Sequence, residues 1–402
     1  MNQFGNPVSA IKHLNSLRRK IFILPAGFSG CAWWRYRLPL NKLIKLGSKF
    51  DIFIKQSSEQ GLTRQEIIQQ SKECDLFAVQ APGDPDAAAL LKFYHSEKKK
   101  IVIDYDDFSF DLSPFNPRYG ALGIKECTVF DEAGKEKMKW RDMENEFDLK
   151  HNQERYEAFT ACVKEADLVT TTTEYLANKF REKTPNVALC PNSIDFDLWK
   201  PLPRPEKYNN QIRIGWFGGD SHYGDIKILK DVFKNLVAKY PNVVITLQAP
   251  PVPFWNDVFE GIPPNRLDWK YWVDLEYYTL LLANRHFDIG LCPLEDNDFN
   301  RCKSGIKHFE FGALKVPTVC TNIVPYNLVV KDKETGFLVE NTTEAWMDTL
   351  SKLIENKELR LSMGEANYQD IYKNHNINQH CMAWEKAFSE VLEGKYSHVD
   401  KN

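Results

Sequence analysis

The sequence predicts an α/β protein built from two Rossmann-like, doubly wound parallel-sheet domains that face each other across a cleft. The length of 402 residues suits two domains better than one. Hydrophobic residues make up 43% of the chain and charged residues 27%, which is typical of globular proteins. Short apolar runs alternate with helical patterns in both halves, and this alternation indicates parallel sheets with crossover helices.

The first predicted domain covers residues 1–197 and contains six strand candidates. They are 21–25, 50–55, 76–80, 101–105, 168–172 and 187–190. Helical patterns between them cover 37–46, 63–71 and 86–96. From residue 131 to residue 164 the chain is rich in charge and only periodically apolar, which predicts long solvated helices.

Residues 198–210 contain three prolines and predict a linker that acts as a hinge. After the linker the alternating pattern restarts. The next strand candidates are 212–216, 243–248, 287–293 and 318–321, with helices expected at 225–240, 275–285 and 306–314. We expect a second domain over 211–376, followed by a C-terminal helix and tail over 377–402. Ligands of such folds bind beyond the carboxyl ends of the strands.

Charge and cysteine content exclude several classes of protein. Lys and Arg total 52 against 55 Asp and Glu, so the formal net charge of −3 argues against a surface that clamps DNA throughout. The nine cysteines are scattered and show no metal-ligand spacing. The sequence shows neither a secretory signal pattern nor an apolar run long enough to span a membrane. We therefore expect a cytoplasmic protein with reduced thiols.

One strand–loop–helix segment in the second half carries the strongest chemical signal. Ser304 and Gly305 stand at the predicted start of the helix, between Lys303 and Lys307. Unpaired amides, the positive end of the helix dipole and two cations together favour an anion. Glu310 lies further along the same side of the helix, where a carboxylate can accept hydrogen bonds from sugar hydroxyls. An ordinary capped helix with a Lys307–Glu310 surface pair is the alternative.

This segment resembles the donor-binding signature of the GT-B glycosyltransferases, specifically the large retaining group 1 type, also called family 4. Four positions match the pattern of that family: Gly305, Glu310, Ala313 and Pro317. The resemblance implies that Glu310 holds the ribose of a nucleotide, and that the amides around Ser304 and Gly305 face the diphosphate and sugar. Cys302 stands where the family has a glutamate, and the lysine-containing version of the motif resembles a divergent branch.

The resemblance extends over most of the second half. It also covers residues 214–225, 335–339 and 381–392. In segment 214–225, Gly218 and Gly219 resemble the phosphate-side loop of the family. Glycines in that loop let backbone amides approach a pyrophosphate closely. A simple turn is the alternative. The usual basic residues of that loop are absent, so we expect Lys303 and Lys307 to carry the phosphate charge. His222 in the loop is a candidate catalytic residue or a solvated turn histidine.

The loop after the first predicted strand resembles the glycine-containing first loop of the family, which reaches the donor or acceptor across the cleft. Gly30 is the glycine that matches. We expect Trp34 to stack on a sugar or base, and Arg35 or Arg37 to contact an acceptor phosphate. A buried aromatic pair with arginines on a helix face is the alternative.

Three carboxylates, Asp104, Asp106 and Asp107, follow the fourth predicted strand. Such a group is costly unless it meets a ligand, a metal or a cation, so we expect catalytic and acceptor-side roles; Asp104 as a turn cap is the alternative. The spacing also fits the metal motif of the unrelated GT-A glycosyltransferases. Because the donor segment lies in the second half, we favour GT-B and expect no metal or other cofactor.

These implications predict a glycosyltransferase, either a hexosyl- or a pentosyltransferase, that uses a UDP- or GDP-sugar and retains the anomeric configuration. The acceptor classes left open are a polysaccharide, a lipid-linked sugar and hydroxymethylated bases of viral DNA. Residues 11–20 carry a weak basic amphipathic pattern, which leaves membrane association open. A non-catalytic nucleotide- or sugar-binding protein on a degenerate GT-B scaffold is the alternative that Cys302 suggests.

Overall fold

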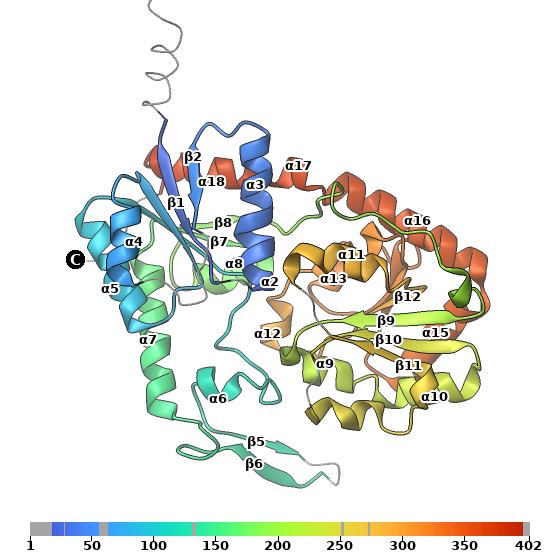
Figure 1. Cartoon of the computed structure of the whole chain (residues 1–402). Coiled ribbons are helices and arrows are strands. Elements are labelled where there is room, and N and C mark those ends of the chain that lie inside the picture. The colour runs from blue at the N-terminus through green and yellow to red at the C-terminus, as the bar shows by residue number, and fades with distance from the viewer. Residues whose placement is uncertain are drawn as a thin grey trace, which may run out of the picture.

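A computed structural model describes residues 18–27, 29–55, 63–130, 134–250, 253–271 and 274–396. Within these residues the chain forms two six-stranded sheets and one small two-stranded sheet. All strand pairs in the two large sheets are parallel. Figure 1 shows the two sheets side by side, each covered by helices on both faces. The predicted α/β class with two doubly wound sheets is confirmed.

The first sheet has the strand order β2-β1-β3-β4-β7-β8. Its strands are β1 (Lys20–Leu24), β2 (Asp51–Ile54), β3 (Leu76–Gln80), β4 (Lys100–Asp104), β7 (Leu168–Thr171) and β8 (Val187–Leu189). Each lies within one residue of its predicted bounds. The central strands of a parallel sheet are buried on both faces and therefore appear in the sequence as continuous apolar runs. The helices of this half are α2 (Gly30–Ala32), η1 (Trp33–Arg37), α3 (Leu38–Lys45), α4 (Arg64–Gln70), α5 (Pro85–Ser96), α6 (Tyr119–Leu122), α7 (Leu149–Glu165) and α8 (Glu174–Arg181).

The prediction of long helices from residue 131 onward is wrong for the first part of that stretch. The chain forms an antiparallel hairpin of β5 (Cys127–Phe130) and β6 (Glu136–Trp140), and α7 begins only at Leu149. Trp140 packs on Tyr119 and Phe147, with ring centroids 5.6 and 6.0 Å apart, so tertiary packing of one aromatic side chain decides the local structure. The hairpin projects from the first half in Figure 1.

The second sheet has the strand order β11-β10-β9-β12-β13-β14, which is the Rossmann order with its switch point between β9 and β12. Its strands are β9 (Ile212–Phe217), β10 (Val243–Gln248), β11 (Leu267–Lys270), β12 (Ile289–Cys292), β13 (Thr318–Thr321) and β14 (Gly336–Val339). Its α-helices are α9 (Tyr223–Lys227), α10 (Lys230–Lys239), α11 (Tyr278–Ala283), α12 (Asp298–Arg301), α13 (Ile306–Ala313), α14 (Tyr326–Val329), α15 (Thr343–Glu355) and α16 (Lys357–Asn374). Short 3₁₀ turns are η2 (Glu206–Tyr208), η3 (Asp220–His222), η4 (Pro253–Phe259), η5 (Pro264–Arg266) and η6 (Leu275–Tyr277). The helix predicted at 225–240 is two helices, α9 and α10.

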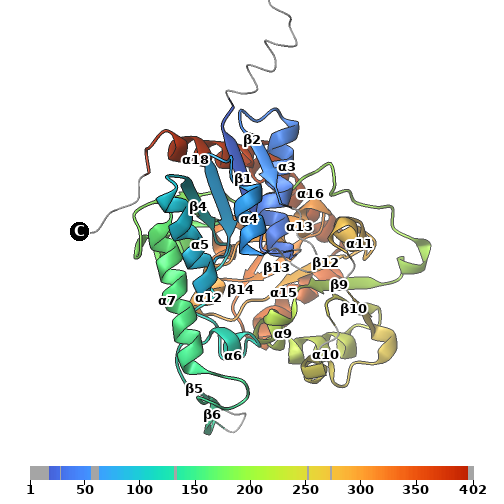
Figure 2. The ribbon, with the colours of Figure 1, turned by 60° about the vertical axis from the view of Figure 1, so that its left-hand side comes forward.

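The last two helices, α17 (Ile377–His380) and α18 (Met382–Leu392), return to the first sheet. Trp384 of α18 lies in the same buried cluster as Ile21 and Leu40, and its ring is 5.1 Å from the ring of Tyr36. Figures 1 and 2 both draw α18 against the first sheet. The C-terminal segment therefore completes the core of the first half.

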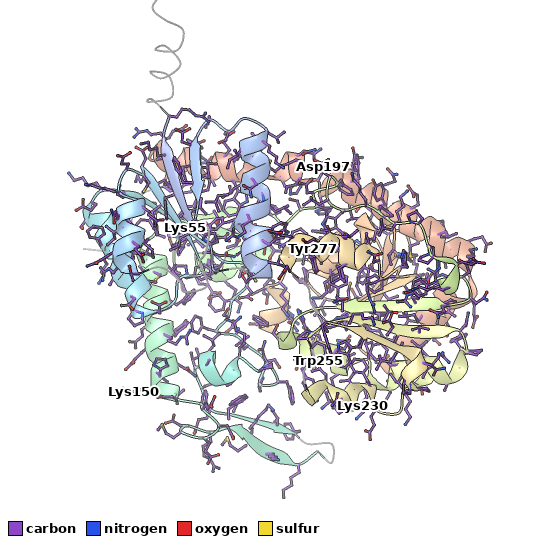
Figure 3. All side chains as sticks on the ribbon, in the orientation of Figure 1. Lys55, Lys150, Asp197, Lys230, Trp255 and Tyr277 are labelled. Atoms are coloured by element: carbon purple, nitrogen blue, oxygen red, sulfur yellow. The ribbon has the colours of Figure 1, made fainter. Side chains whose placement is uncertain are left out.

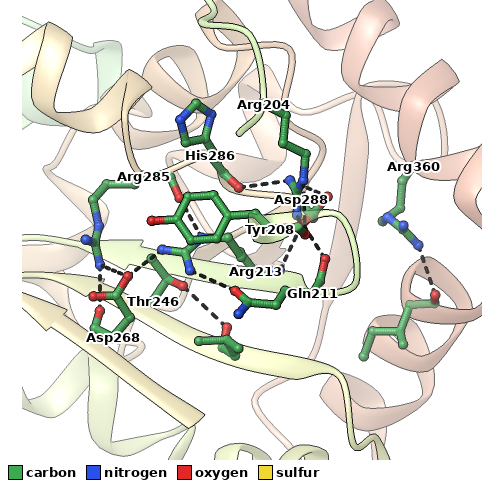
Figure 4. Close-up of polar contacts among 12 residues, drawn as sticks. Arg204, Tyr208, Gln211, Arg213, Thr246, Asp268, Arg285, His286, Asp288 and Arg360 are labelled. Carbon is green, nitrogen blue, oxygen red and sulfur yellow. Dashed lines mark hydrogen bonds and ion pairs between the residues drawn. The ribbon is translucent and has the colours of Figure 1, made fainter. Parts of the chain in front are cut away.

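The linker is fastened at the amino edge of the second sheet. Figure 4 shows Arg204 of the linker bonded to both oxygens of Asp288, with N–O distances of 3.1 and 2.9 Å. Beside it, Arg213 and Arg285 share Asp268, and the Arg213 guanidinium lies 4.2 Å from the ring centre of Tyr208. This arginine cluster ties the linker to the second half, at the edge opposite the carboxyl ends of its strands.

Candidate active site at the carboxyl edge of the second sheet

Two loops meet where β9 and β12 separate, at the switch point of the second sheet. The loop after β9 carries Gly218, Gly219 and His222, and the chain after β12 leads through α12 to α13. A charged cluster forms between them from His222, Asp225, Lys303 and Lys307. The structure thus brings together three residues that the sequence analysis selected from separate motifs.

Asp225 is the centre of this cluster. One of its carboxylate oxygens accepts hydrogen bonds from the Glu295 amide at 2.8 Å and from Asn300 Nδ2 at 2.7 Å. The other lies 2.6 Å from His222 Nδ1 and 3.6 Å from Lys303 Nζ. Burial acts to raise the pKa of Asp225, but Lys303 and these hydrogen bonds outweigh it and hold the pKa well below its usual range. Asp225 is therefore a fixed anion that orders the residues around it.

His222 is neutral and engaged through both ring nitrogens. Burial and the two neighbouring lysines lower the pKa of His222 to about 3. With Nδ1 donating to Asp225, Nε2 accepts from Lys307 Nζ at 3.1 Å. Burial and Lys303 lower the pKa of Lys307 to about 8. In this arrangement His222 orients Lys307, and its predicted catalytic role stays a prediction.

Helix α13 begins beside this cluster without a side-chain cap. Gly305 is its N-cap residue and no side chain of the described part of the chain bonds the first amides. The Ser304 hydroxyl oxygen accepts a hydrogen bond from Asn192 Nδ2 at 2.9 Å, so its own proton is directed elsewhere. Lys303 and Lys307 lie next to these uncapped amides, and their predicted contact with a diphosphate stays a prediction.

Glu310 is buried, with 2% of its surface exposed, and Tyr278 donates a hydrogen bond to its Oε1 at 2.8 Å. Burial raises the pKa of Glu310 to about 8. The alternative of a Lys307–Glu310 surface pair is therefore wrong.

Tyr278 in turn contacts Trp199, whose ring stacks on Trp34 with centroids 6.2 Å apart. One face of Trp34 is thus covered by protein, and its stacking on a sugar stays a prediction.

The predicted site glycines differ in the space beside their Cα atoms. A Cβ at Gly218 would lie 2.5 Å from the Trp216 ring, and one at Gly305 would lie 2.7 Å from a Val329 methyl group. These two glycines are required by protein packing. Gly219 and Gly30 have no atom within 4 Å of such a Cβ, so open space lies beside both. Their contacts with a donor stay predictions.

Arg35 and Asp104 form a buried ion pair, and their predicted acceptor-side and catalytic roles stay predictions. Arg35 Nε and Nη2 donate to the two oxygens of Asp104 at 3.1 and 2.8 Å, and both residues have no exposed surface. Nη1 donates to the Cys190 carbonyl and to Asn192 Oδ1 at 2.9 Å. Each residue neutralises the charge of the other inside the first half. The fold with two six-stranded parallel sheets excludes the GT-A alternative.

Asp106 and Asp107 lie beyond Asp104 and are half-buried. Burial and Asp107 raise the pKa of Asp106 to about 6. Asp107 accepts a hydrogen bond from the Ser109 hydroxyl at 2.6 Å. Arg37 is buried, and burial lowers its pKa. The catalytic roles of the two aspartates and the acceptor contact of Arg37 stay predictions.

Cys302 is fully buried and joins the hydrophobic cluster of the first half. Burial raises the pKa of its thiol to about 12, so it is neither a nucleophile nor a substitute for a sugar-binding carboxylate.

Within the described residues no group of three or more His, Cys, Asp or Glu side chains could hold a metal ion. No described helix is long and apolar enough to cross a membrane. Residues 11–17 of the basic pattern lie outside the described residues, and Lys20 at its other end begins β1 with its side chain paired to Glu73.

The sequence analysis missed several residues that build the site. They are Asn192, Asp225, Tyr278, Glu295 and Asn300. Asp225 had a local signal, since it follows His222 by three residues at the start of a predicted helix. The others come from distant segments, and only the fold brings them to the cluster.

Comparisons with known proteins agree with the resemblance over a limited stretch. Residues 303–370 match the family Glycosyl transferases group 1. No curated protein matches the chain.

Among solved structures, HepE of Anabaena in complex with UDP-glucose is 13% identical, with a TM-score of 0.64 over 92% of this chain and 99% of that one. Sucrose-phosphate synthase of Thermosynechococcus elongatus is 12% identical, with a TM-score of 0.63 over 94% and 100%. A glycosyltransferase from Rickettsia africae is 14% identical, with a TM-score of 0.62 over 94% and 100%. The chain has the GT-B glycosyltransferase fold and carries a group 1 segment.

Proposed function

We propose that the protein is a glycosyltransferase that binds a UDP- or GDP-sugar on its second half and transfers the sugar to an acceptor held by the first half. The observation that carries this proposal is the convergence of Lys303 and Lys307 on His222, next to the helix α13, which starts without a side-chain cap. The group 1 segment begins at the same residue, Lys303. Support also comes from the GT-B fold, since one similar structure contains UDP-glucose.

The donor diphosphate lies against the α13 amides in this proposal, where the helix dipole and the two lysines stabilise its charge. The bond between the anomeric carbon and the diphosphate breaks, and negative charge grows on the leaving oxygen. Asp225 holds Lys303 and His222 holds Lys307 in place before the reaction. Cations that are already in place stabilise the growing negative charge without rearrangement. Glu310 accepts hydrogen bonds from the ribose hydroxyls.

The acceptor hydroxyl forms the new bond to the anomeric carbon and loses its proton. Asp106 and Asp107 on the first half are the candidate groups for the acceptor side, and the raised pKa of Asp106 suits proton transfer close to neutral pH. Retention of the anomeric configuration belongs to this proposal because the group 1 segment resembles the retaining family. Nuclear magnetic resonance of the product's anomeric proton tests it.

The donor site is tested by calorimetry with UDP, GDP and their sugars. We expect one nucleotide series to bind the wild-type protein, and the Lys303→Ala/Lys307→Ala variant to lose at least tenfold in affinity. Lys352→Ala is the control, since Lys352 is exposed on α15 and has no ion pair with any described residue. Failure of every nucleoside diphosphate to bind would contradict the proposal.

A second candidate function is a binding protein without catalysis. The burial of Cys302 favours it, because no carboxylate stands at the position where the family contacts the donor sugar. Slow hydrolysis of a bound nucleotide-sugar supports the enzyme. Binding without any turnover, with or without acceptors, supports the second candidate.

A further inference from the structure

Two lysines from opposite halves of the molecule converge on one aromatic ring. Lys139 of β6 lies 5.1 Å from the ring centre of Phe115, and Lys227 at the end of α9 lies 5.8 Å from the same centre. Phe115 belongs to the loop between β4 and α6, which β6 holds through a hydrogen bond from Trp140 Nε1 to the Pro114 carbonyl at 2.8 Å. Both views draw α6 beside α9 (Figures 1 and 2).

A third lysine, Lys137, lies on the same face of β6 as Lys139 because side chains alternate along a strand. We call Lys137, Lys139 and Lys227 the cationic strip. None of the three forms an ion pair with a carboxylate of the described residues. Burial lowers the pKa of Lys139, and Lys227 and Lys137 add to the lowering. Like charges gathered without a counter-charge repel one another, so the strip would gain from an anion.

The strip lies at the rim of the space between the two halves, next to the donor cluster. Asn116 Nδ2 donates to the Ser221 carbonyl at 3.4 Å, and a Cβ at Gly224 would be 3.8 Å from Phe115 Cβ. A small cavity between the halves is lined by Asn116, Ser221, Gly224 and Asp225 among others. Asp225 therefore belongs both to this cavity wall and to the donor cluster. Because this cavity is only large enough for about one water molecule, an acceptor would lie outside it, beside the strip.

We propose that the cationic strip binds phosphate groups of the acceptor, so that the acceptor is a phosphate-bearing saccharide and not a neutral glycan. This inference rests on the proposed function, since the strip acts on the acceptor only if the neighbouring cluster binds a donor. A doubly charged phosphate can pair with two ammonium groups at once. Three lysines on a chain with a net charge of −3 are too few for a nucleic acid, which needs a longer basic surface.

The experiment measures binding of short-chain inorganic polyphosphate in the presence of saturating UDP, so that the donor cluster is occupied. We expect Lys139→Ala/Lys227→Ala to weaken polyphosphate binding at least tenfold. The slope of log affinity against log salt should become shallower by one to two units, about one for each lost charge. The matched control is Lys150→Ala/Lys234→Ala, which removes the same charge from α7 and α10; Figure 3 labels Lys150 on α7. Melting temperatures confirm that both variants fold.

Equal loss in both double variants, or no loss in either, overturns the inference. Binding of neutral dextran as tight as that of polyphosphate also overturns it, and tighter binding of duplex DNA through the same lysines assigns the strip to nucleic acid instead. The UDP measurement on the same samples tests the proposed function separately. If UDP does not bind, the same comparison is made in the Lys303→Ala/Lys307→Ala background, and the strip is then judged as an anion site alone.

Discussion

The affinity for the nucleotide should depend on pH through Glu310 and Lys307, with opposite signs. The pKa of Glu310 is raised to about 8, so the side chain is mostly protonated at pH 7 in the empty protein. Ribose hydroxyls that donate to it favour the carboxylate, and binding therefore strengthens as the pH rises toward 8. The pKa of Lys307 is lowered to about 8, and its cation is lost above that value. The two groups together predict a bell-shaped profile with its maximum close to pH 8.

The size of the rising limb follows from the structure. Hydrogen bonds to a charged group contribute about 1.5 to 3 kcal/mol each. Ionising Glu310 at pH 7, one unit below its pKa, costs about 1.4 kcal/mol. Two ribose hydrogen bonds of about 1.5 kcal/mol each stabilise the complex by about 3 kcal/mol. After the cost of ionising Glu310 is subtracted, about half of this binding free energy remains at pH 7 and nearly all of it above pH 8.

Calorimetric titration with UDP across this pH range measures the profile. Glu310→Gln should weaken binding at pH 8 by about 1.5 to 3 kcal/mol, roughly ten- to hundredfold, and should remove the rising limb. Lys307→Arg should remove the falling limb, because a guanidinium keeps its charge. Glu276→Gln is the control, an exposed glutamate on η6 close to Tyr278. A flat profile in the wild-type protein, or unchanged binding by Glu310→Gln, would refute the assignment of the ribose to Glu310.

Three further predictions test other parts of the molecule. Arg35→Ala leaves Asp104 buried without its partner and should destabilise folding by about 3 to 5 kcal/mol, measured by urea unfolding; unfolding like that of the wild type would show that the pair is not structural. Gly218→Ala forces a methyl group into the Trp216 ring and should lower the stability by about 1 to 3 kcal/mol, whereas an unchanged melting temperature would show that the loop adapts easily. Tyr278→Phe removes the hydrogen bond that lowers the pKa of Glu310, so the rising limb of the UDP profile should move to higher pH; an unshifted limb would contradict this role.

The central strands of both sheets were predictable because they are buried on both faces and appear in the sequence as unbroken apolar runs. The strand β11 and the hairpin β5–β6 were not predicted, since neither has such a run. β11 lies at the edge of its sheet and is only half-buried, and β6 is held in place by the packing of Trp140. Edge strands depend on their neighbours more than on their own residues.

The site was predictable in part. Lys307 and Glu310 lie on α13 at a spacing that implies a shared face, and Lys303 and Ser304 directly precede that helix on the same short segment. Asp104 shows the limit of local interpretation. A carboxylate at the end of a strand has the same sequence signal whether it meets a substrate or an arginine, and only the fold brings Arg35 to it.

The return of α17 and α18 to the first sheet has a consequence for biosynthesis. Ile21, Tyr36 and Leu40 are made before the residues that cover them, Trp384 and Phe388, and the whole second sheet is synthesised in between. While the ribosome is still translating, this apolar surface lacks its final layer and is exposed to solvent or to other chains. A chain cut short before α18 should therefore aggregate through the uncovered apolar face of the first half.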